Sequence, residues 1–307
     1  MLTSLTKVLK KAQRGGYAVG AFNINNLETL QAVMDAAEQE HAPVIVQTSE
    51  GAIHYAGMEE LGGLVHLAAK RTKRPVVFHL DHGKNYDLVV AAIKSGFYTS
   101  VMFDGSALPY KENVRKTKKI VKMAHKRGIS VEAELGLIAG VEDFVSVKDH
   151  EAAMTDPDQA ADFVKQTDCD ALAVAIGTRH GAFKMKKEST LDFHRLKLIA
   201  EATSVPLVLH GASGVPARIK ALCTKYGCEI STAKGIPDSQ IKKAVTLGIR
   251  KINIDTDLRI AFDAGIRKFL KERPEVIDPR EILKPAKALM TKLVRHKISM
   301  LGSAKKG

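Results

Sequence analysis

The chain of 307 residues carries 47 lysines and arginines against 34 aspartates and glutamates, which gives a formal net charge of +13 at pH 7. The basic residues are dispersed and Trp is absent, which argues against a nucleic-acid stacking platform and favours a solvated surface, while small anionic substrates stay compatible with the charge. No linker, low-complexity tract or heptad array divides the chain, so we expect one domain spanning residues 1–307.

The sequence predicts a protein of the reducing cytoplasm. Its basic amino-terminal segment has apolar residues at helical spacing, without the continuous core of a signal peptide, and no later segment is long and apolar enough to span a bilayer. The cysteines, Cys169, Cys223 and Cys228, are odd in number and lack CxxC spacing. We therefore expect no membrane partner, no disulfide framework and no thiolate zinc site.

Eight short runs rich in Val, Ile, Ala and Leu recur along the chain, separated by amphipathic stretches with the helical period. Because their hydrophobicity is continuous rather than alternating, both faces of each strand should be buried, as in a parallel barrel covered by helices. Eight repeats predict a (β/α)8 TIM barrel with its active site at the carboxyl ends of the strands. The runs are YAVGAFNI near residue 17, APVIVQTS near 42, PVVFHLD near 75, TSVMFDG near 99, ISVEAELG near 129, ALAVAIG near 171, PLVLHGA near 206 and KINIDT near 251.

The segments between these runs predict helices, for example over 26–41, 110–128 and 191–204, and the chain ends in a helical extension. The stretch from Ala139 to Thr155 has acidic residues and few anchoring apolar side chains. It predicts a long mobile loop that would act as a lid.

Polar residues fall where the strands end. The candidates are Asp81 and His82 after the third run, Asp104 after the fourth, Glu132 and Glu134 in the fifth, His180 beyond the sixth, His210 at the seventh, and Asn253 and Asp255 at the eighth. Three imidazoles from separate strand ends suit Zn²⁺ with an open position for a substrate oxygen, although a structural, hydrogen-bonded role for each histidine remains an alternative. His79 lies earlier in its strand and is expected to be a buried partner.

Two segments are candidate phosphate cradles. In LHGASG, residues 209–214, the glycines Gly211 and Gly214 with Ser213 would let backbone N–H groups approach an anion near a helix start. In NIDTDLRIAF, Asp255 and Thr256 occupy expected capping positions. A plain tight turn and a plain capping motif are the alternatives. Phosphate sites after the last two strands are nevertheless a recurring use of this barrel.

Taken together, HLDHG, SVEAELG, AIGTRHG, LHGASG and KINIDTDLR resemble the class II, metal-dependent ketose-bisphosphate aldolases over nearly the whole chain, and most of all the shorter fructose-bisphosphate type. The resemblance implies zinc-dependent, reversible cleavage of fructose 1,6-bisphosphate into dihydroxyacetone phosphate and glyceraldehyde 3-phosphate; close relatives act on tagatose 1,6-bisphosphate. It implies that His82, His180 and His210 bind the catalytic zinc, and that Asp104 and Glu134 hold a second or displaced metal ion. A monovalent cation is a further expectation, and the role of Glu132 stays open.

The same resemblance implies the substrate contacts. Those for the phosphate of dihydroxyacetone phosphate are Gly181, Lys184, Gly211, Ser213, Asp255 and Thr256. Ser49 and Arg259 resemble groups that hold the distal phosphate, with the arginine supplied by a neighbouring subunit of a homodimer or homotetramer. Asp81 would exchange the C4 hydroxyl proton, Asn253 would donate to the developing oxyanion, and Glu142 would exchange a proton with C1. Val141 and the less glycine-rich LIAG depart from the family pattern in the lid.

Three other readings compete with this one. A Schiff-base aldolase would need a lysine inside a strand, and the sequence predicts none there, since Lys184 and Lys234 lie in expected loops and Lys251 begins the last run. A metal-dependent hydrolase would leave both phosphate cradles idle. A sugar-phosphate or nucleic-acid binding module would keep its function after metal removal.

Overall fold

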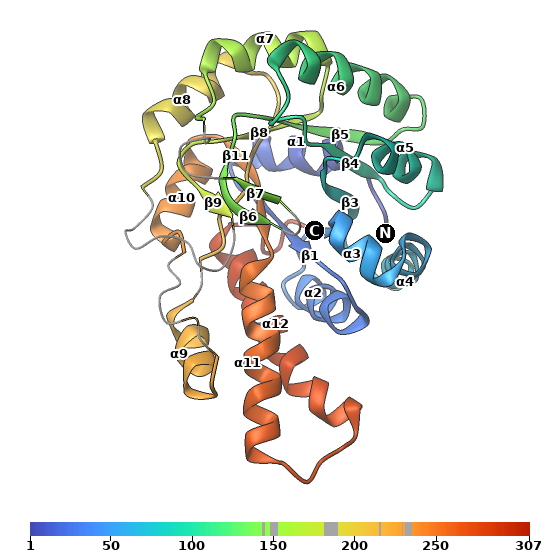
Figure 1. Cartoon of the computed structure of the whole chain (residues 1–307), viewed down its shortest axis with the longest axis vertical. Helices are drawn as coiled ribbons and strands as arrows, with labels where there is room; N and C mark the ends of the chain where they lie inside the picture. The colour runs from blue at the N-terminus through green and yellow to red at the C-terminus, as the bar shows by residue number, and fades with distance from the viewer. Residues whose placement is uncertain (143–144, 148–152, 181–189, 215, 229, 231–234) are drawn as a thin grey trace.

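The computed structural model describes residues 1–142, 145–147, 153–180, 190–214, 216–228, 230 and 235–307. Eight parallel strands close into a barrel in the order β1-β11-β10-β8-β5-β4-β3-β2, so each strand pairs with the next barrel strand along the chain (Figure 1). The predicted (β/α)8 barrel is confirmed, and all eight predicted runs form its strands. These are β1 Val19–Asn23, β2 Val44–Thr48, β3 Val76–Gly83, β4 Ser100–Phe103, β5 Ser130–Leu135, β8 Ala171–Val174, β10 Leu207–Leu209 and β11 Ile249–Ile254.

Helices form the outer layer of the barrel (Figure 1). Local signals place their ends: Asn26 caps α2 in a capping box with Thr29, and Asp156 caps α7, whose first residue is Pro157. The helices are α1 Leu5–Gly15, α2 Leu27–Gln39, α3 Glu50–Ala56, α4 Met58–Lys70, α5 Tyr86–Ser95, α6 Tyr110–His125, α7 Pro157–Thr167, α8 Phe193–Ala202, α9 Ala217–Lys225, α10 Asp238–Thr246, α11 Thr256–Glu272 and α12 Pro279–Met300.

The barrel interior is closed at the amino-terminal ends of its strands. There the apolar face of α1 packs against the inward-facing side chains of the strands in one buried cluster. The predicted amphipathic amino-terminal segment is therefore a plug, and the opposite, carboxyl end is left to polar residues. The plug consists of Leu5, Val8, Leu9 and Ala12, and the strands contribute Val19, Ala21, Ile45, Val77, Met102, Ala171, Ala173 and Val208.

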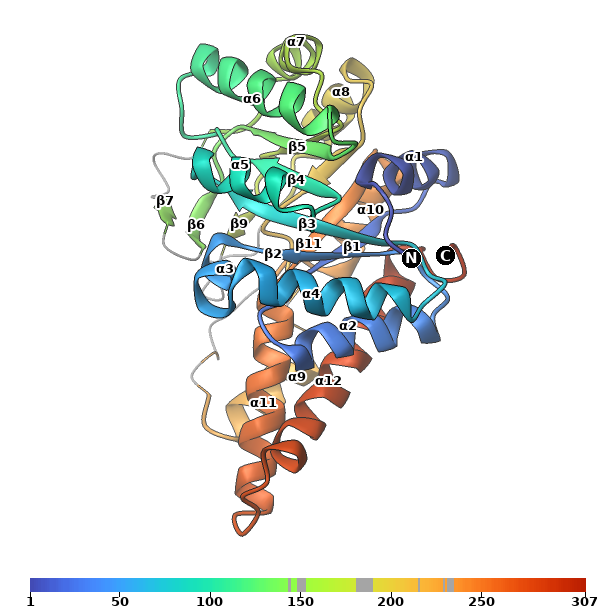
Figure 2. The same cartoon turned by 90° about the vertical axis from the view of Figure 1, so that its right-hand side faces the viewer.

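A small second sheet lies on the side of the barrel toward which the strands run (Figure 2). Its order is β7-β6-β9, from β6 Ala139–Glu142, β7 Val145–Val147 and β9 Arg179–His180. The stretch predicted as a long mobile loop, residues 139–155, thus contains two short strands in its described part, and its mobility stays a prediction. The strands β6 and β7 form an antiparallel pair, and the backbone of Leu137 pairs with that of Ala153 at the base of this segment.

Beyond the barrel, α11 and α12 pack against each other and extend well away from the strands (Figures 1 and 2). The crossing is close: a Cβ on Gly265 would lie 2.5 Å from the Cα of Ala286. From there α12 returns along α2, and the last residues bond to the backbone of Glu40 and His41. The carboxyl-terminal helix thus connects the far end of this extension with the barrel wall.

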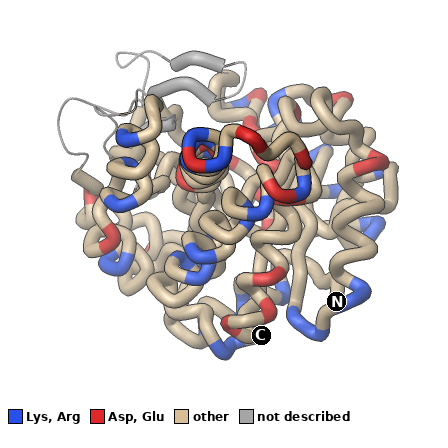
Figure 3. Tube along the Cα trace, turned by 90° about the horizontal axis from the view of Figure 1, so that it is seen from below, with Lys and Arg blue, Asp and Glu red and all other residues tan. Residues whose placement is uncertain are grey.

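Lysine and arginine positions are distributed along the outer helices among acidic positions, rather than gathered in one region of the Cα trace in Figure 3. This agrees with the dispersed pattern in the sequence. Within the described residues, no helix is both long enough and apolar enough to cross a lipid bilayer.

A β-bulge at the end of β3 changes the direction of the polar side chains at the carboxyl end of the barrel. Between Leu80 and Gly83 the pairing with β4 shifts register, so that two residues of β3 stand opposite one of β4. Gly83 permits the close approach that follows, because a Cβ there would lie 2.5 Å from the backbone oxygen of Met102 and 2.4 Å from Val89. The glycine of HLDHG is needed for packing rather than for a positive φ.

We predict that Gly83→Ala lowers the free energy of unfolding by about 1–3 kcal/mol, because the added methyl group must displace the β4 backbone or Val89. Urea denaturation of the metal-free protein measures this. Gly63→Ala is the matched control, since nothing lies within 4 Å of a Cβ at that position of α4. It should stabilise the helix by about 0.5–1 kcal/mol. Equal effects in the two variants would contradict the packing argument.

Candidate metal centre and active site

Asp81 and His82 are adjacent in sequence, yet both side chains are buried at the carboxyl end of the barrel. In a regular strand, neighbouring side chains point to opposite faces. Here the β3 bulge and a positive φ of 44° at His82 bring both toward the same centre. A non-glycine residue in this conformation is strained, and such strain is typical of functional positions.

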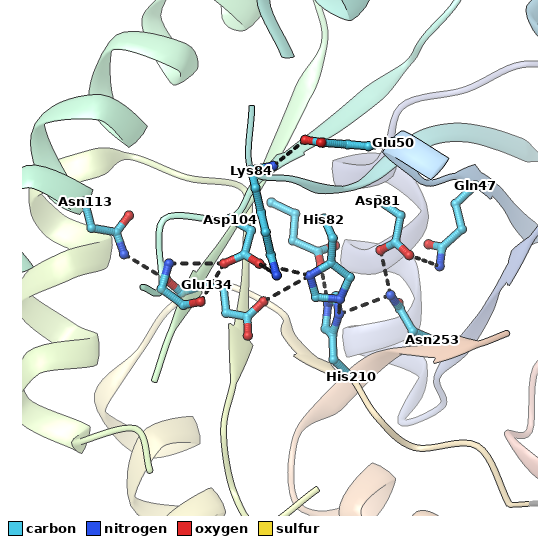
Figure 4. Close-up of polar contacts among 12 residues, drawn as sticks. Gln47, Glu50, Asp81, His82, Lys84, Asp104, Asn113, Glu134, His210 and Asn253 are labelled. Carbon is cyan, nitrogen blue, oxygen red and sulfur yellow. Dashed lines mark hydrogen bonds and ion pairs between the residues drawn. The ribbon is translucent and has the colours of Figure 1, made fainter. Parts of the chain in front are cut away.

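The rings of His82 and His210 meet at this centre (Figure 4). Nε2 of His82 lies 2.6 Å from Nδ1 of His210. On their far sides, Nδ1 of His82 lies 3.2 Å from Asp104 Oδ2, and Nε2 of His210 lies 2.8 Å from Glu132 Oε1. A carboxylate only accepts, so it holds the N–H on the far side of each ring and leaves a lone pair on each facing nitrogen. Burial and the nearby His82 lower the pKa of His210, which favours its neutral form.

Carboxylates complete the surroundings of His82. Oxygens of Asp104 and Glu134 lie 3.2 and 3.6 Å from its Nδ1, and Lys84 Nζ lies 3.6 Å from Asp104. Burial alone would raise the pKa of Asp104, but the hydrogen bond from His82 and the charge of Lys84 hold it well below its ordinary value. Two groups, Asp81–His82–His210 and His82–Asp104–Glu134, keep their possible ligand atoms within 4.8 Å of one another. Neutral imidazoles with carboxylates form a donor set that suits a divalent ion such as zinc.

Three amide groups orient the carboxylate of Asp81. Asn253 Nδ2 donates to Oδ1 at 2.8 Å, while Asn23 Nδ2 and Gln47 Nε2 donate to Oδ2 at 2.9 and 3.1 Å. The same Asn253 nitrogen lies 3.2 Å from His210 Nδ1. Asn253 therefore lies between the candidate base and the candidate metal ligand. The sequence reasoning missed Asn23 and Gln47, although both lie at the ends of strands, where polar residues were informative elsewhere.

The expectation that no lysine lies inside a strand is wrong for Lys251. β11 begins two residues earlier than predicted, so Lys251 is an interior residue of the strand and is fully buried. Its Nζ lies 2.9 Å from Glu132 Oε2 and donates to Asn253 Oδ1 at 2.7 Å. An ammonium held in an ion pair offers no lone pair to attack a carbonyl, so the structure still disfavours a Schiff-base reaction.

Glu132 connects Lys251 with His210 through its two carboxylate oxygens. Burial alone would raise its pKa, but the charge of Lys251 and the hydrogen bond from His210 hold it well below its ordinary value. The carboxylate also faces the ring of His79, whose Nε2 lies 3.6 Å away and whose Nδ1 contacts Ser100 Oγ at 2.9 Å. Burial lowers the pKa of His79 well below its ordinary value, so His79 is a buried neutral partner, as predicted.

Several predicted residues lie outside the described part of the structure. Gly181 and Lys184 belong to the undescribed segments, as does Lys234, the lysine of a rejected alternative. For His180 and Glu142 only the backbone is described: His180 in β9 pairs with Gly140 of β6, and Glu142 ends β6. The third imidazole and the lid carboxylate therefore remain predictions.

The first candidate phosphate cradle has the expected turn, with Gly211 at φ 61° and Ser213 buried. The backbone N–H of Gly214, however, donates to Asp257 Oδ2 at 3.0 Å. In the second cradle, Asp255 takes the N-cap position of α11 next to Thr256, but no side-chain capping bond forms. Its carboxylate instead accepts from Arg259, whose Nε and Nη2 lie 2.9 and 2.8 Å from the two oxygens. The expected capping role of Asp255 is wrong for its side chain.

Ser49 and Arg259 line one pocket of about 400 Å³ together with Asn23 and Asp255. Ser49 also caps α3, where its Oγ accepts from the N–H of Ala52. The exposed Tyr55 lies at the same pocket and was not predicted.

Cys223 and Cys228 meet Asp263 in a second cluster, which the spacing of the cysteines did not predict. Burial raises the pKa of both thiols, and Cys223 Sγ donates to Asp263 Oδ2 at 3.5 Å. Both oxygens of Asp263 accept from Arg267 Nε at 2.8 Å. The carboxylate is thus neutralised by an arginine and the sulfurs keep their protons, so we assign no metal to this cluster.

Comparisons with known proteins agree with this geometry. The family described as fructose-bisphosphate aldolase class-II matches residues 3–306. The fructose-bisphosphate aldolase of Thermus caldophilus is 46% identical over 303 residues, which cover 99% of each chain. That of Helicobacter pylori is 44% identical over 307 residues and covers 100% of each. The crystal structure of the YdjI aldolase from Escherichia coli K12 superposes with a TM-score of 0.81 at 35% identity, covering 100% of this chain and 99% of that one.

Fold and site together define a (β/α)8 barrel with a buried cluster of histidines and carboxylates, suited to a divalent metal ion, at the carboxyl ends of its strands. The chain belongs to the class II fructose-bisphosphate aldolase family.

We predict that Lys251→Met lowers the free energy of unfolding of the metal-free protein by about 3–5 kcal/mol, because Glu132 is left as an uncompensated buried charge. The double variant Lys251→Met/Glu132→Gln removes both charges and should recover most of this loss. Urea denaturation in the presence of a chelator measures both. If the single and double variants lose the same stability, the ion pair does not hold this part of the barrel.

Proposed function

We propose that this protein is a zinc-dependent aldolase that reversibly cleaves fructose 1,6-bisphosphate into dihydroxyacetone phosphate and glyceraldehyde 3-phosphate. The observation that carries the proposal is the pair of facing nitrogens of His82 and His210, each ring held by a carboxylate on its far side. Both carboxylates favour the tautomers whose facing nitrogens carry lone pairs, and a cation bound by both nitrogens would relieve the repulsion between them. The relatives named as fructose-bisphosphate aldolases support the choice of substrate.

In this proposal His82, His210 and His180 hold the catalytic zinc, while Asp104 and Glu134 hold a second or displaced cation. A zinc ion bound there would supply Lewis acidity toward the C2 carbonyl oxygen of the ketose, where charge develops as the C3–C4 bond breaks. Glu132 keeps the Nε2–H of His210 turned away from the centre, so that Nδ1 remains the ligand atom.

Asp81 accepts the proton of the C4 hydroxyl during cleavage and returns it during condensation. The amides of Asn23 and Gln47 hold one carboxylate oxygen, so that the group keeps its direction while it exchanges a proton. Asn253 directs its Nδ2 toward the centre because Lys251, which can only donate, fixes its Oδ1 on the other side. That nitrogen donates to the oxyanion as it forms.

The remaining assignments rest on the family pattern. Glu142, at the end of β6, exchanges a proton with C1 when the β6–β7 hairpin closes over the substrate as a mobile lid within the single domain 1–307. Gly181, Lys184, Gly211, Ser213, Asp255 and Thr256 contact the phosphate of the three-carbon half. Ser49 and Arg259 hold the distal phosphate, with the arginine supplied by a neighbouring subunit. We further propose a cytoplasmic homodimer or homotetramer, in keeping with the reduced cysteines.

The second candidate substrate is tagatose 1,6-bisphosphate, which differs in the configuration at C4, the carbon whose hydroxyl Asp81 contacts in this proposal. A coupled cleavage assay with both bisphosphates, before and after chelation and zinc readdition, tests substrate and cofactor in one series. We expect cleavage of the fructose epimer that is lost on chelation and restored by zinc. Activity that survives complete metal removal would refute the mechanism, and preference for the tagatose epimer would reassign the substrate.

We predict that His210→Ala abolishes zinc retention, because a tetrahedral site with three protein ligands loses one of its imidazoles. Metal content after gel filtration, measured by atomic emission, is the readout. His194→Ala is the control, because His194 lies exposed on α8. A His210→Ala protein that keeps stoichiometric zinc would exclude His210 as a ligand.

We predict that Asp81→Ala keeps zinc but lowers kcat by about 10²–10⁴-fold, the usual contribution of a positioned general base. The zinc content and kcat of the same preparation are measured side by side. Normal turnover in a zinc-loaded Asp81→Ala protein would remove Asp81 from the mechanism.

A further inference from the structure

A second buried lysine lies beneath the first candidate phosphate cradle. Lys297 of α12 is only 2% exposed, and its Nζ lies 3.0 Å from Asp257 Oδ2 and 3.7 Å from Asp238 Oδ1. Asp257 itself is fully buried in the first turn of α11. This pair therefore connects the carboxyl-terminal helix with the start of the helix that follows the last barrel strand.

The same Asp257 oxygen accepts the backbone N–H of Gly214 at 3.0 Å, so Lys297, Asp257 and the LHGASG loop form one contact chain. The packing is tight. A Cβ on Gly214 would lie 2.8 Å from Lys297 Nζ, and a Cβ on Gly235 would lie 2.3 Å from the backbone carbon of Gly214. The N–H of Ile236 donates to the carbonyl of Ser213 at 3.2 Å. The loop is held from below by α12 and from the side by residues 235–236.

These contacts present an electrostatic problem. A buried carboxylate next to a phosphate cradle repels the phosphate, and in a partly desolvated site that repulsion is weakly screened. We propose that Lys297 is a positioning residue for phosphate binding: it neutralises Asp257 beneath the 211–214 loop, so that Asp257 can fix Gly214 without repelling the substrate phosphate. This inference rests on the proposed function and names the group that supports one of its phosphate sites.

The charge state of Lys297 agrees with this role. Burial alone would lower its pKa, but the charges of Asp257 and Asp238 outweigh burial and raise the pKa above its ordinary value. Asp238 is shared with His296, whose Nε2 lies 2.8 Å from its second oxygen. Lys297 is therefore an ammonium at neutral pH, and its positive charge lies 3.0 Å from the Asp257 carboxylate beneath the loop.

Two single variants change the net charge of this pair in opposite directions, and a double variant removes both charges. Lys297→Met removes the positive charge beside the Asp257 carboxylate. Asp257→Asn removes the negative charge, and its amide oxygen can still accept from Gly214 and Lys297. The double variant Lys297→Met/Asp257→Asn is neutral at both positions. Lys292→Met is the matched control, because Lys292 is an exposed lysine of the same helix.

Two measurements are made on each zinc-loaded variant. Isothermal titration gives the dissociation constant of dihydroxyacetone phosphate. Condensation with glyceraldehyde 3-phosphate gives kcat/KM for dihydroxyacetone phosphate relative to unphosphorylated dihydroxyacetone. The ratio separates a phosphate-specific effect from a general loss of structure, which lowers both rates alike.

We expect Lys297→Met to weaken binding and to lower the selectivity ratio by about tenfold, the scale of one unit charge in a partly screened site. Asp257→Asn should bind several-fold more tightly than the wild type, and the double variant should return close to it. An unchanged ratio in Lys297→Met would overturn the proposal. Should that variant fail to fold, unchanged or weaker binding in Asp257→Asn would overturn it equally. A wild type that binds dihydroxyacetone phosphate but cleaves no bisphosphate would refute the proposed function. The dissociation constants of the variants would then test this inference by themselves.

Discussion

The buried ion pair between Lys251 and Glu132 connects the two halves of the candidate site. Glu132 accepts a hydrogen bond from the Nε2–H of His210, which determines that Nδ1 of this ring faces His82. Lys251 donates a hydrogen bond to Oδ1 of Asn253, which determines that the amide nitrogen faces Asp81. Because lysine only donates and a carboxylate only accepts, neither choice can reverse while the pair is intact. The buried charges of Lys251 and Glu132 thus specify the orientation of the His210 ring and of the Asn253 amide.

A second buried ion pair, Lys297–Asp257, lies beneath the candidate phosphate cradle at residues 211–214. Its Asp257 carboxylate accepts the N–H of Gly214. Such pairs add little stability compared with apolar packing, since desolvation offsets most of their attraction. Their contribution is orientation. In both places charged residues replace apolar packing at the carboxyl end of the barrel, so that neighbouring donors and acceptors have one arrangement, while α1 closes the other end mainly with apolar side chains.

Much of this site could be predicted from where polar residues interrupt apolar strands. That rule found Asp81, His82, Asp104, Glu134, His210 and Asn253, because the carboxyl ends of parallel strands must converge. It failed for Lys251, where a strand that begins two residues early turned a predicted boundary residue into a buried one. It also passed over Asn23 and Gln47, since a single amide at a strand end has no chemistry of its own until Asp81 lies next to it.

The sequence by itself determined the eight-stranded barrel, its family and the end at which the polar groups collect, since hydrophobic periodicity and motif order are local properties of the chain. Tertiary structure alone decided that adjacent Asp81 and His82 share one centre, because a register shift against β4 cannot be read from β3. It also decided that Lys297 lies beneath a loop some eighty residues earlier in the chain. Which charges meet depends on the path of the whole backbone, and a pattern within one segment carries no record of that path.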